Sequence, residues 1–200
     1  MLPILYSYRR CPYAMRARMA LTLADITVEI REISLREKPA HMLEISPKAT
    51  VPVLMLPDGK VIEESLEIMV WALKEHALGA NIHEACRALI VENDLIFKQA
   101  LDAYKYPQRH KNLTQPQSRT QGEVFLQKLE CLLEKNIYLF DAKPSLADIA
   151  IFPFVRQFAA VDSAWFDGVP YSKLRAWLND WMESELFKSV MQKKALHTTM

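Results

Sequence analysis

One cysteine near the N-terminus has the surroundings that a reactive thiol needs. Cys11 follows Arg9 and Arg10 and directly precedes Pro12. A thiolate attacks disulfides and electrophiles, and positive charge or the start of a helix favours its formation. Proline commonly opens a helix, because its missing N–H has no helical partner there anyway. We therefore expect the pKa of the Cys11 thiol to lie below the roughly 8.5 of free cysteine. The alternative is that Cys11 is an unreactive residue that packs as a small buried hydrophobic side chain.

The other cysteines and the histidines do not add a second reactive centre. Cys86 and Cys131 fall within predicted helices among apolar residues, which favours an inert, buried role for both. Three widely separated cysteines do not form a disulfide framework, and they suit a reducing, cytoplasmic environment. The 5 histidines are scattered without the spacing of a zinc site, so no metal is expected.

The elements that position Cys11 read as a small α/β domain. An apolar run ends just before the cysteine and predicts a strand, and a helix follows from Pro12. Pro57-Asp58-Gly59 separates two apolar segments and is typical of a β-hairpin. Ser65 is expected to cap the next helix, with Leu66, Met69, Val70 and Leu73 on its buried face. The predicted order is β-α-β-α-β-β-α, with strands at 2–8, 26–33, 53–56 and 60–63, helices at 12–24 and 39–45, and a last helix that follows its cap at Ser65.

Strand signals stop after Gly79, and the rest of the chain is predicted to be helical. A proline-free segment at 83–104 precedes a polar loop that contains Pro107 and Pro116. Ser145 to Asp148 has the pattern of a capping box ahead of an apolar helix. Further helices are predicted at 118–135, 149–161, 171–182 and 184–193, with a linker close to 78–82.

The overall composition excludes several classes of protein. Half of the 200 residues are apolar, the formal net charge is +1, and there are only 4 glycines. This composition predicts a globular chain and gives no electrostatic case for nucleic acid or an anionic membrane surface. No apolar run approaches the roughly 20 residues of a membrane span, and residues 1–5 do not resemble a secretory signal.

Four segments resemble the cytosolic glutathione S-transferase superfamily, in particular its cysteine-type, omega-like members. Residues 10–16 (RCPYAMR) resemble the active-site turn of those enzymes and also the glutaredoxin turn. Residues 49–54 (ATVPVL) resemble the segment with a cis-proline. Residues 63–68 (EESLEI) resemble the γ-glutamyl-binding turn, and residues 145–148 (SLAD) the N-capping box of the sixth helix. The four segments keep the family's order and approximate spacing.

The resemblance implies a fold and a set of glutathione contacts. It implies a thioredoxin-like domain over residues 1–77, followed by an all-helical domain over 83–200 that contributes the second-substrate site. Glutathione would be the co-substrate and Cys11 the catalytic thiol. The expected glutathione-binding residues are Tyr13 near the thiol, Lys38 on the glycyl carboxylate, the Val51 backbone beside cis-Pro52, Glu64 on the ammonium group and Ser65 on the γ-glutamyl carboxylate.

The predicted reaction is thiol transfer or reduction by a monothiol route. Position 14 is alanine where the dithiol glutaredoxin turn has its second cysteine, so Cys11 would act alone on mixed disulfides or glutathionyl adducts. One alternative is conjugation of electrophiles, with the hydroxyl of Ser7 or Tyr8 assisting glutathione. Another is a non-catalytic, glutathione-binding regulatory protein.

The partners implied by the resemblance are small molecules and a second copy of the chain. The second substrate would be a small electrophile or a glutathionylated thiol, and Phe97, Tyr104, Tyr106 and Trp165 are candidates for the wall of its pocket. Most relatives are homodimers, whereas two-domain glutaredoxins are monomers. A homodimer is therefore expected, with no nucleic acid or membrane partner.

Overall fold

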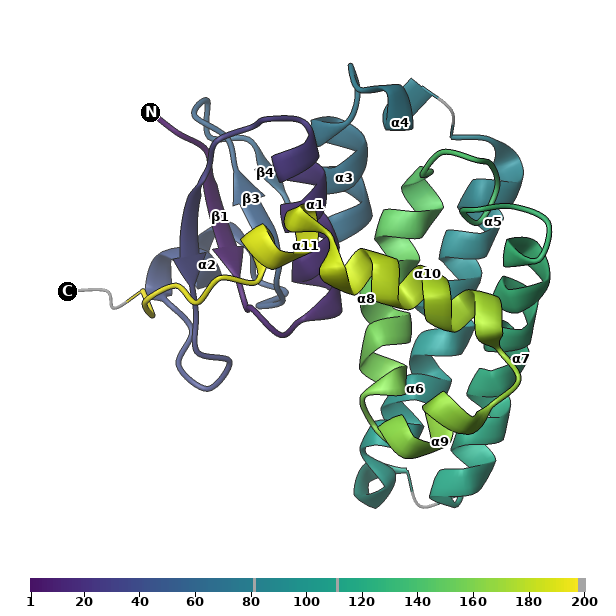
Figure 1. Cartoon of the computed structure of the whole chain (residues 1–200). Coiled ribbons are helices and arrows are strands. Elements are labelled where there is room, and N and C mark those ends of the chain that lie inside the picture. Colours follow the sequence, from purple (N-terminus) through teal and green to yellow (C-terminus); the bar gives the residue numbers. More distant parts are fainter. Residues whose placement is uncertain (81, 111, 198–200) are drawn as a thin grey trace. The chain divides into compact units, whose positions relative to one another are not determined.

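A computed structural model describes residues 1–80, 82–110 and 112–197 of the chain. The chain divides into two compact units, drawn in Figure 1. The first unit combines Met1–Ala80 with Ser184–Met200, and the second is Asn81–Glu183. Within the described ranges, no helix has both the length and the apolar character that a membrane span requires.

The first unit is built on a four-stranded mixed sheet. The central strand β1 (Ile4–Ser7) runs parallel to β2 (Glu29–Glu32) and antiparallel to β3 (Val53–Met55). The hairpin partner β4 (Val61–Ile62) completes the sheet order β2-β1-β3-β4. The connecting helices are α1 (Pro12–Leu23), α2 (Ala40–Ile45) and α3 (Ser65–Ala72), followed by a short α4 (Ala77–Ala80). The predicted order β-α-β-α-β-β-α is confirmed, and this is the thioredoxin-like arrangement.

The hairpin between β3 and β4 forms where the sequence predicts it. Gly59 has φ +86°, a left-handed conformation that glycine adopts without steric strain. The Gly59 N–H donates to the Leu56 carbonyl over 3.0 Å, and the Leu56 N–H donates to the Lys60 carbonyl over 2.8 Å. Asp58 accepts from the Lys60 N–H at 3.0 Å. These bonds place β4 beside β3 and bring the chain back to the start of α3.

The sheet buries apolar residues on both faces, because successive side chains of a strand point to opposite sides. Ile4, Tyr6 and Val53 pack with Met42 of α2 in one cluster. The alternate residues Leu5 and Leu54 are fully buried as well. This two-sided burial fixes the strand ends that position Cys11 and Val51.

The buried face of α3 differs from the one predicted. Met69 and Leu73 are buried as expected, but Val70 is 37% exposed, and Ile68 and Ala72 are buried instead. The helix also begins one residue earlier than expected, since Glu64 is its N-cap and Ser65 is its first helical residue. Packing against α1 selected the buried face, which the apolar pattern alone did not identify.

The C-terminal segment of the chain returns to the first unit. Helix α11 (Glu185–Val190) packs on α1 and is shorter than the predicted helix at 184–193. The following residues run beside β2, where Leu196 forms a parallel bridge with Glu32. The His197 N–H donates to the Glu32 carbonyl at 2.7 Å.

The second unit is helical. The segment predicted at 83–104 consists of α5 (Glu84–Glu92), a π-helical turn (Asn93–Phe97) and α6 (Lys98–Lys105), in immediate succession. The sequence predicted Pro116 in the loop before this helix, but it lies in the first turn of α7 (Gln115–Leu133). The remaining elements are a 3₁₀ turn (Pro107–Arg109), α8 (Leu146–Ala159), the unpredicted α9 (Ser163–Gly168) and α10 (Ser172–Glu183).

An aromatic cluster forms part of the core of this second unit. The Phe97 ring stacks on Phe125 at 4.8 Å and lies 5.3 Å from Phe158. Tyr104 packs on Phe158 at 4.9 Å, and Trp165 lies at 6.2 Å from that same ring. Because Phe97 and Tyr104 are only 1% and 2% exposed, they are core residues of the helical unit and not the pocket wall that the sequence suggested.

Candidate active site

Cys11 lies between the end of β1 and the start of α1, as predicted. It is the N-cap residue of α1, with extended backbone angles of φ −75° and ψ 123°. The Cys11 N–H donates to the Tyr8 carbonyl at 3.0 Å, which closes the turn after β1. The first N–H groups of a helix have no helical acceptors and favour negative charge. The half-buried Cys11 sulfur therefore lies where a thiolate is stabilised.

The structure brings Cys11 next to the segment with the cis-proline. Its Sγ atom lies 3.7 Å from the carbonyl oxygen of Val51. The Val51–Pro52 peptide bond is cis, as the resemblance predicted. The thiol and the Val51 backbone, 40 residues apart in sequence, thus lie in direct contact.

Ser65 is joined to helix α1 through a buried arginine that sequence reasoning did not identify. Arg16 Nε donates to Ser65 Oγ at 3.0 Å, and the two residues are 2% and 4% exposed. The Arg16 guanidinium also lies over the Tyr13 ring, 5.0 Å from its centroid. Arg16 therefore links three expected features: the helix that starts at Cys11, the aromatic side chain at Tyr13, and the hydroxyl of Ser65.

Glu64 is paired with a second residue that the sequence analysis missed. The Lys48 ammonium lies 2.9 Å from a Glu64 carboxylate oxygen and 3.9 Å from Glu63. The hydrogen bond that Lys48 donates to Glu64 is the main cause that raises the pKa of Lys48. The Glu64 side chain is 61% exposed and accessible to a ligand. Lys48 directly follows Pro47 and precedes the cis-proline segment. This position was the one feature of the sequence that could have indicated a role for Lys48 at the site.

Lys38 is not joined to the other expected residues. It lies half-buried in the loop between β2 and α2. Among the residues that the structure describes, no hydrogen bond or ion pair connects it with Cys11, Glu64 or Ser65. Its expected contact with a glycyl carboxylate stays a prediction.

Arg18 holds together the strand end and the loop that precede Cys11. Its Nη1 donates to Ser7 Oγ at 2.5 Å and its Nη2 to the Arg9 carbonyl at 2.9 Å, while Nε donates to the Val190 carbonyl at 3.1 Å. Burial lowers the pKa of the guanidinium to about 10, and attraction to Glu32 and to Cys11 opposes that shift. Because that attraction is mutual, the positive charge of Arg18 also favours a negative Cys11.

The hydroxyl of Ser7 is poorly placed for the alternative chemistry. Ser7 is 0% exposed and its oxygen accepts from Arg18. A side chain enclosed in this way is not accessible to the sulfur of a bound substrate. Tyr8 is half-buried and remains available as a hydroxyl.

The two remaining cysteines differ from each other. Cys86 is fully buried, as expected, and burial raises the pKa of its thiol. Cys131 is exposed on α7, so its predicted burial is wrong. The apolar residues around Cys131 in the sequence occupy other faces of that helix. Within the described ranges, no three His, Cys, Asp or Glu side chains gather as a metal site would require.

Two family models match the chain. Residues 5–80 match the N-terminal domain of glutathione S-transferases, and residues 117–180 match the C-terminal domain. Rat glutathione S-transferase omega-1 is 28% identical over 192 residues, which are 92% of this chain and 78% of that protein. A probable maleylacetoacetate isomerase of Caenorhabditis elegans is 38% identical over 76 residues, which are 37% of this chain and 35% of the isomerase.

A solved structure of similar fold covers nearly the whole chain. It is a possible glutathione S-transferase from Rhodopseudomonas palustris, with a TM-score of 0.81 at 19% identity. The alignment covers 97% of this chain and all of the other. At that identity the likeness supports the fold, a mixed sheet with helices followed by a helical unit.

Proposed function

This chain belongs to the glutathione S-transferase superfamily, and we propose that it is a glutathione-dependent thiol transferase or reductase that acts through Cys11. It is a glutathione S-transferase-like enzyme, and relatives named as omega-class transferases align over most of its length. The single observation that carries the proposal is the place of Cys11. Its sulfur lies at the start of α1 and in contact with the Val51 carbonyl, and the positive charge of Arg18 attracts a negative charge on it.

The proposed reaction has two thiol–disulfide exchanges. The Cys11 thiolate attacks the glutathione sulfur of a mixed disulfide, the old S–S bond breaks, and the released thiolate takes a proton. The enzyme then carries glutathione as a Cys11 disulfide. A second glutathione thiolate attacks that disulfide, which releases oxidised glutathione and restores the Cys11 thiolate. Since position 14 is alanine, Cys11 has no second thiol beside it in the turn to complete the cycle.

Glutathione would lie along the residues between Cys11 and α3. Its cysteinyl backbone would pair with Val51 beside Pro52, while its γ-glutamyl group would meet Ser65 and Glu64 at the N-terminus of α3. Glu64 is exposed and already holds a cation, Lys48. The glutathione ammonium would replace Lys48 as the partner of the Glu64 carboxylate. Lys48 could then pair with a carboxylate of glutathione. Tyr13 and Lys38 would border this site.

Glu64→Gln is expected to raise the dissociation constant of glutathione roughly tenfold, because the amide keeps the shape but loses the charge that binds the ammonium. Glu67→Gln is the matched control, since Glu67 is exposed like Glu64 and lies three residues further on, in the first turn of α3. Isothermal titration calorimetry with reduced glutathione measures both variants. Equal weakening by the two substitutions would mean that general charge, and not a contact with Glu64, controls binding.

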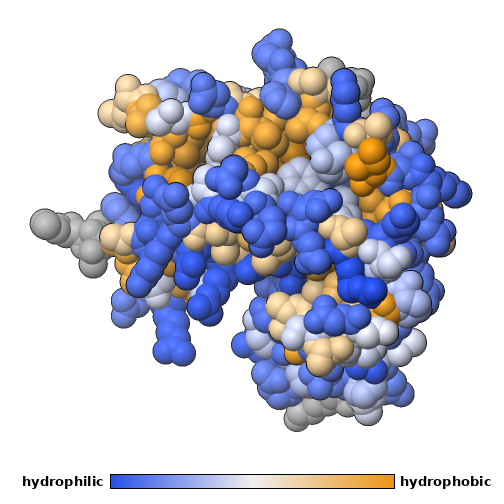
Figure 2. Space-filling model, viewed as in Figure 1, coloured by the Kyte–Doolittle hydropathy of each residue, from blue (hydrophilic) through white to orange (hydrophobic). Residues whose placement is uncertain are grey.

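We also propose a homodimer that functions in the cytoplasm. Figure 2 shows one face on which hydrophilic side chains surround several apolar patches. Three apolar residues of the second unit are exposed around the π-helical turn: Val91, Leu95 and Ile96 are exposed by 49%, 59% and 66%. Light scattering after gel filtration is expected to give twice the mass of one chain for the natural protein. It should give the single-chain mass for Leu95→Glu if this surface forms the contact, and a single-chain mass for both proteins would contradict the dimer.

A further inference from the structure

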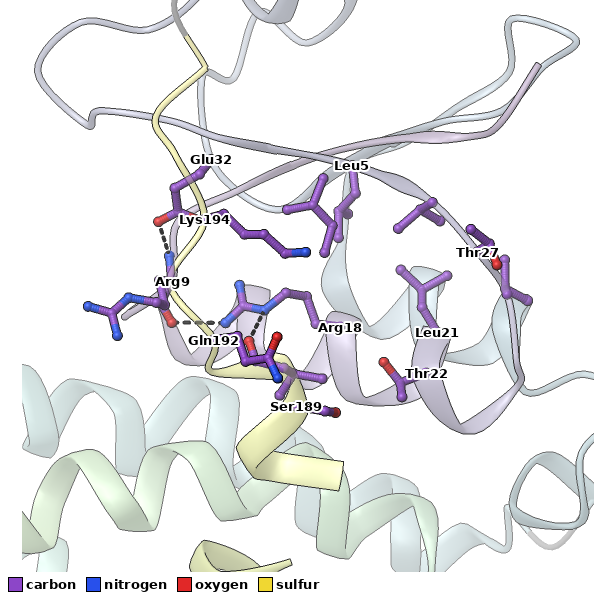
Figure 3. A pocket seen from close by; sticks show the side chains of 14 residues that line it. Leu5, Arg9, Arg18, Leu21, Thr22, Thr27, Glu32, Ser189, Gln192 and Lys194 are labelled. Atoms are coloured by element: carbon purple, nitrogen blue, oxygen red, sulfur yellow. Dashed lines mark hydrogen bonds between the residues drawn. The ribbon is translucent and has the colours of Figure 1, made fainter. Parts of the chain in front are cut away.

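A pocket in the first unit is separate from the proposed glutathione site. Its volume is about 310 Å³, which is enough for a small organic ligand. The wall is formed by α1, β2 and the C-terminal segment, as Figure 3 shows. None of the residues expected to bind glutathione lines it.

One side of the pocket is apolar. Leu5 of β1 and Leu21 of α1 are almost fully buried there, and Ile26, Ile30 and Val190 add to the same wall. The rim is polar and exposed, with Thr22, Thr27 and Gln192 on it. An apolar wall of this kind favours a hydrocarbon chain or ring over a purely polar ligand.

The other side carries an excess of positive charge. Arg18 is 4% exposed, and its acceptors among the described residues are the uncharged Ser7 hydroxyl, two backbone carbonyls and the Met191 sulfur. A guanidinium has five N–H donors. One N–H on Nη1 therefore has no protein acceptor among the described residues, and no carboxylate lies within ion-pair distance of Arg18 there. A buried cation without a close carboxylate favours the binding of an anion.

Lys194 adds a second cation to this side. Figure 3 shows its side chain extending from the C-terminal segment toward Leu5 and Arg18. Arg9 also belongs to the lining, but Figure 3 shows its guanidinium pointing away from the pocket. Among the described lining residues, the acidic side chain is Glu32, whose carboxylate accepts from the Arg9 N–H at 2.6 Å. Arg18 and Lys194 thus bring two positive charges to this side against the one negative charge of Glu32.

We propose that this pocket binds a small amphipathic anion, a carboxylate with an unbranched medium-length hydrocarbon chain. The carboxylate lies between Lys194 and the remaining N–H of Arg18, and the chain lies against Leu5, Leu21 and Ile30. The ligand contacts α1 and the C-terminal segment together. Binding does not require the Cys11 sulfur, because Cys11 does not line the pocket.

The test is titration of the full-length protein with octanoate, followed by NMR of labelled Leu, Ile and Val methyl groups. Shifts are expected at Leu21, Ile26, Ile30 and Val190, and they should persist in Cys11→Ala. Octanamide, the uncharged counterpart, should bind at least about fivefold more weakly, since it lacks the charge.

Lys194→Glu should weaken the binding of octanoate about tenfold. Lys193→Glu is the matched control, since Lys193 is exposed next in sequence but does not line the pocket, and it should change binding less than twofold.

Three results would overturn the proposal. The first is the absence of shifts at these methyl groups, or shifts confined to the second unit. The second is equal affinity for octanamide and octanoate. The third is an equal effect of Lys194→Glu and Lys193→Glu. Arg18 is left unchanged in these experiments because its hydrogen bonds hold the loop before Cys11, so its replacement would disturb folding as well as binding.

Discussion

Cys11→Ala is expected to reduce the turnover of a glutathione mixed disulfide by on the order of a thousandfold or more. The substitution removes the sulfur that forms the covalent intermediate, and no other thiol of the chain has an equivalent place. Cys86 is buried, and Cys131 is on the surface of α7 in the helical unit. Steady-state reduction of a small glutathione mixed disulfide, coupled to glutathione reductase, measures the effect.

The controls separate thiol transfer from hydroxyl-assisted conjugation. Cys131→Ser should keep full activity, since the covalent step does not involve that thiol. The natural enzyme should show ping-pong kinetics, because the first product leaves before the second glutathione binds. Sequential kinetics, or activity that survives Cys11→Ala and disappears in Tyr8→Phe, would favour conjugation supported by a hydroxyl.

Asp148→Ala is expected to destabilise the helical unit by about 3–5 kcal/mol. The carboxylate is 0% exposed and accepts four hydrogen bonds. The Ser145 N–H and hydroxyl donate at 2.8 and 2.6 Å, Leu139 N–H at 3.0 Å, and Trp177 Nε1 at 2.9 Å. Burial raises the pKa of Asp148, and these hydrogen bonds oppose that shift. Alanine would leave the four donors buried without their acceptor.

Urea unfolding followed by tryptophan fluorescence measures this loss. Asp162→Ala is the matched control, because Asp162 caps α9 through the Trp165 N–H at 3.0 Å but is largely exposed. Its replacement should cost only about 1 kcal/mol. If the two variants lose equal stability, the buried network around Asp148 does not stabilise the unit as described.

The sequence predicted those elements of the fold that local chemistry determines. The Pro-Asp-Gly turn, the proline at the start of α1 and the capping box at Ser145 all act within a few residues, and all three are confirmed. The buried face of α3 and the exposure of Cys131 depend on which neighbouring helix packs against each element, so the sequence pattern alone could not determine them. Helix α9 was missed because it is only six residues long.

In the candidate site, too, the contacts between residues far apart in the sequence could not be predicted. The cis bond at Pro52 was predicted only through the family resemblance, since most X–Pro bonds in folded proteins are trans. Arg16, Arg18 and Lys48 were missed because each acts across a long stretch of sequence. Arg16 meets Ser65 49 residues away, and Arg18 meets Val190 172 residues away. No local pattern identifies such pairs, and only the folded chain shows that these arginines link α1 to α3 and to the C-terminal segment.

Trapping of the covalent intermediate tests directly whether Cys11 carries glutathione during the reaction. The Cys131→Ser protein is mixed with one equivalent of a small glutathione mixed disulfide, quenched with acid, and analysed by mass spectrometry of the intact protein and its peptides. One glutathionyl group per chain is expected on the peptide that contains Cys11, and it should be removed completely after reduced glutathione is added. A protein that turns over the substrate while Cys11 stays unmodified, or a Cys11 adduct that reduced glutathione does not release, would contradict this role of Cys11.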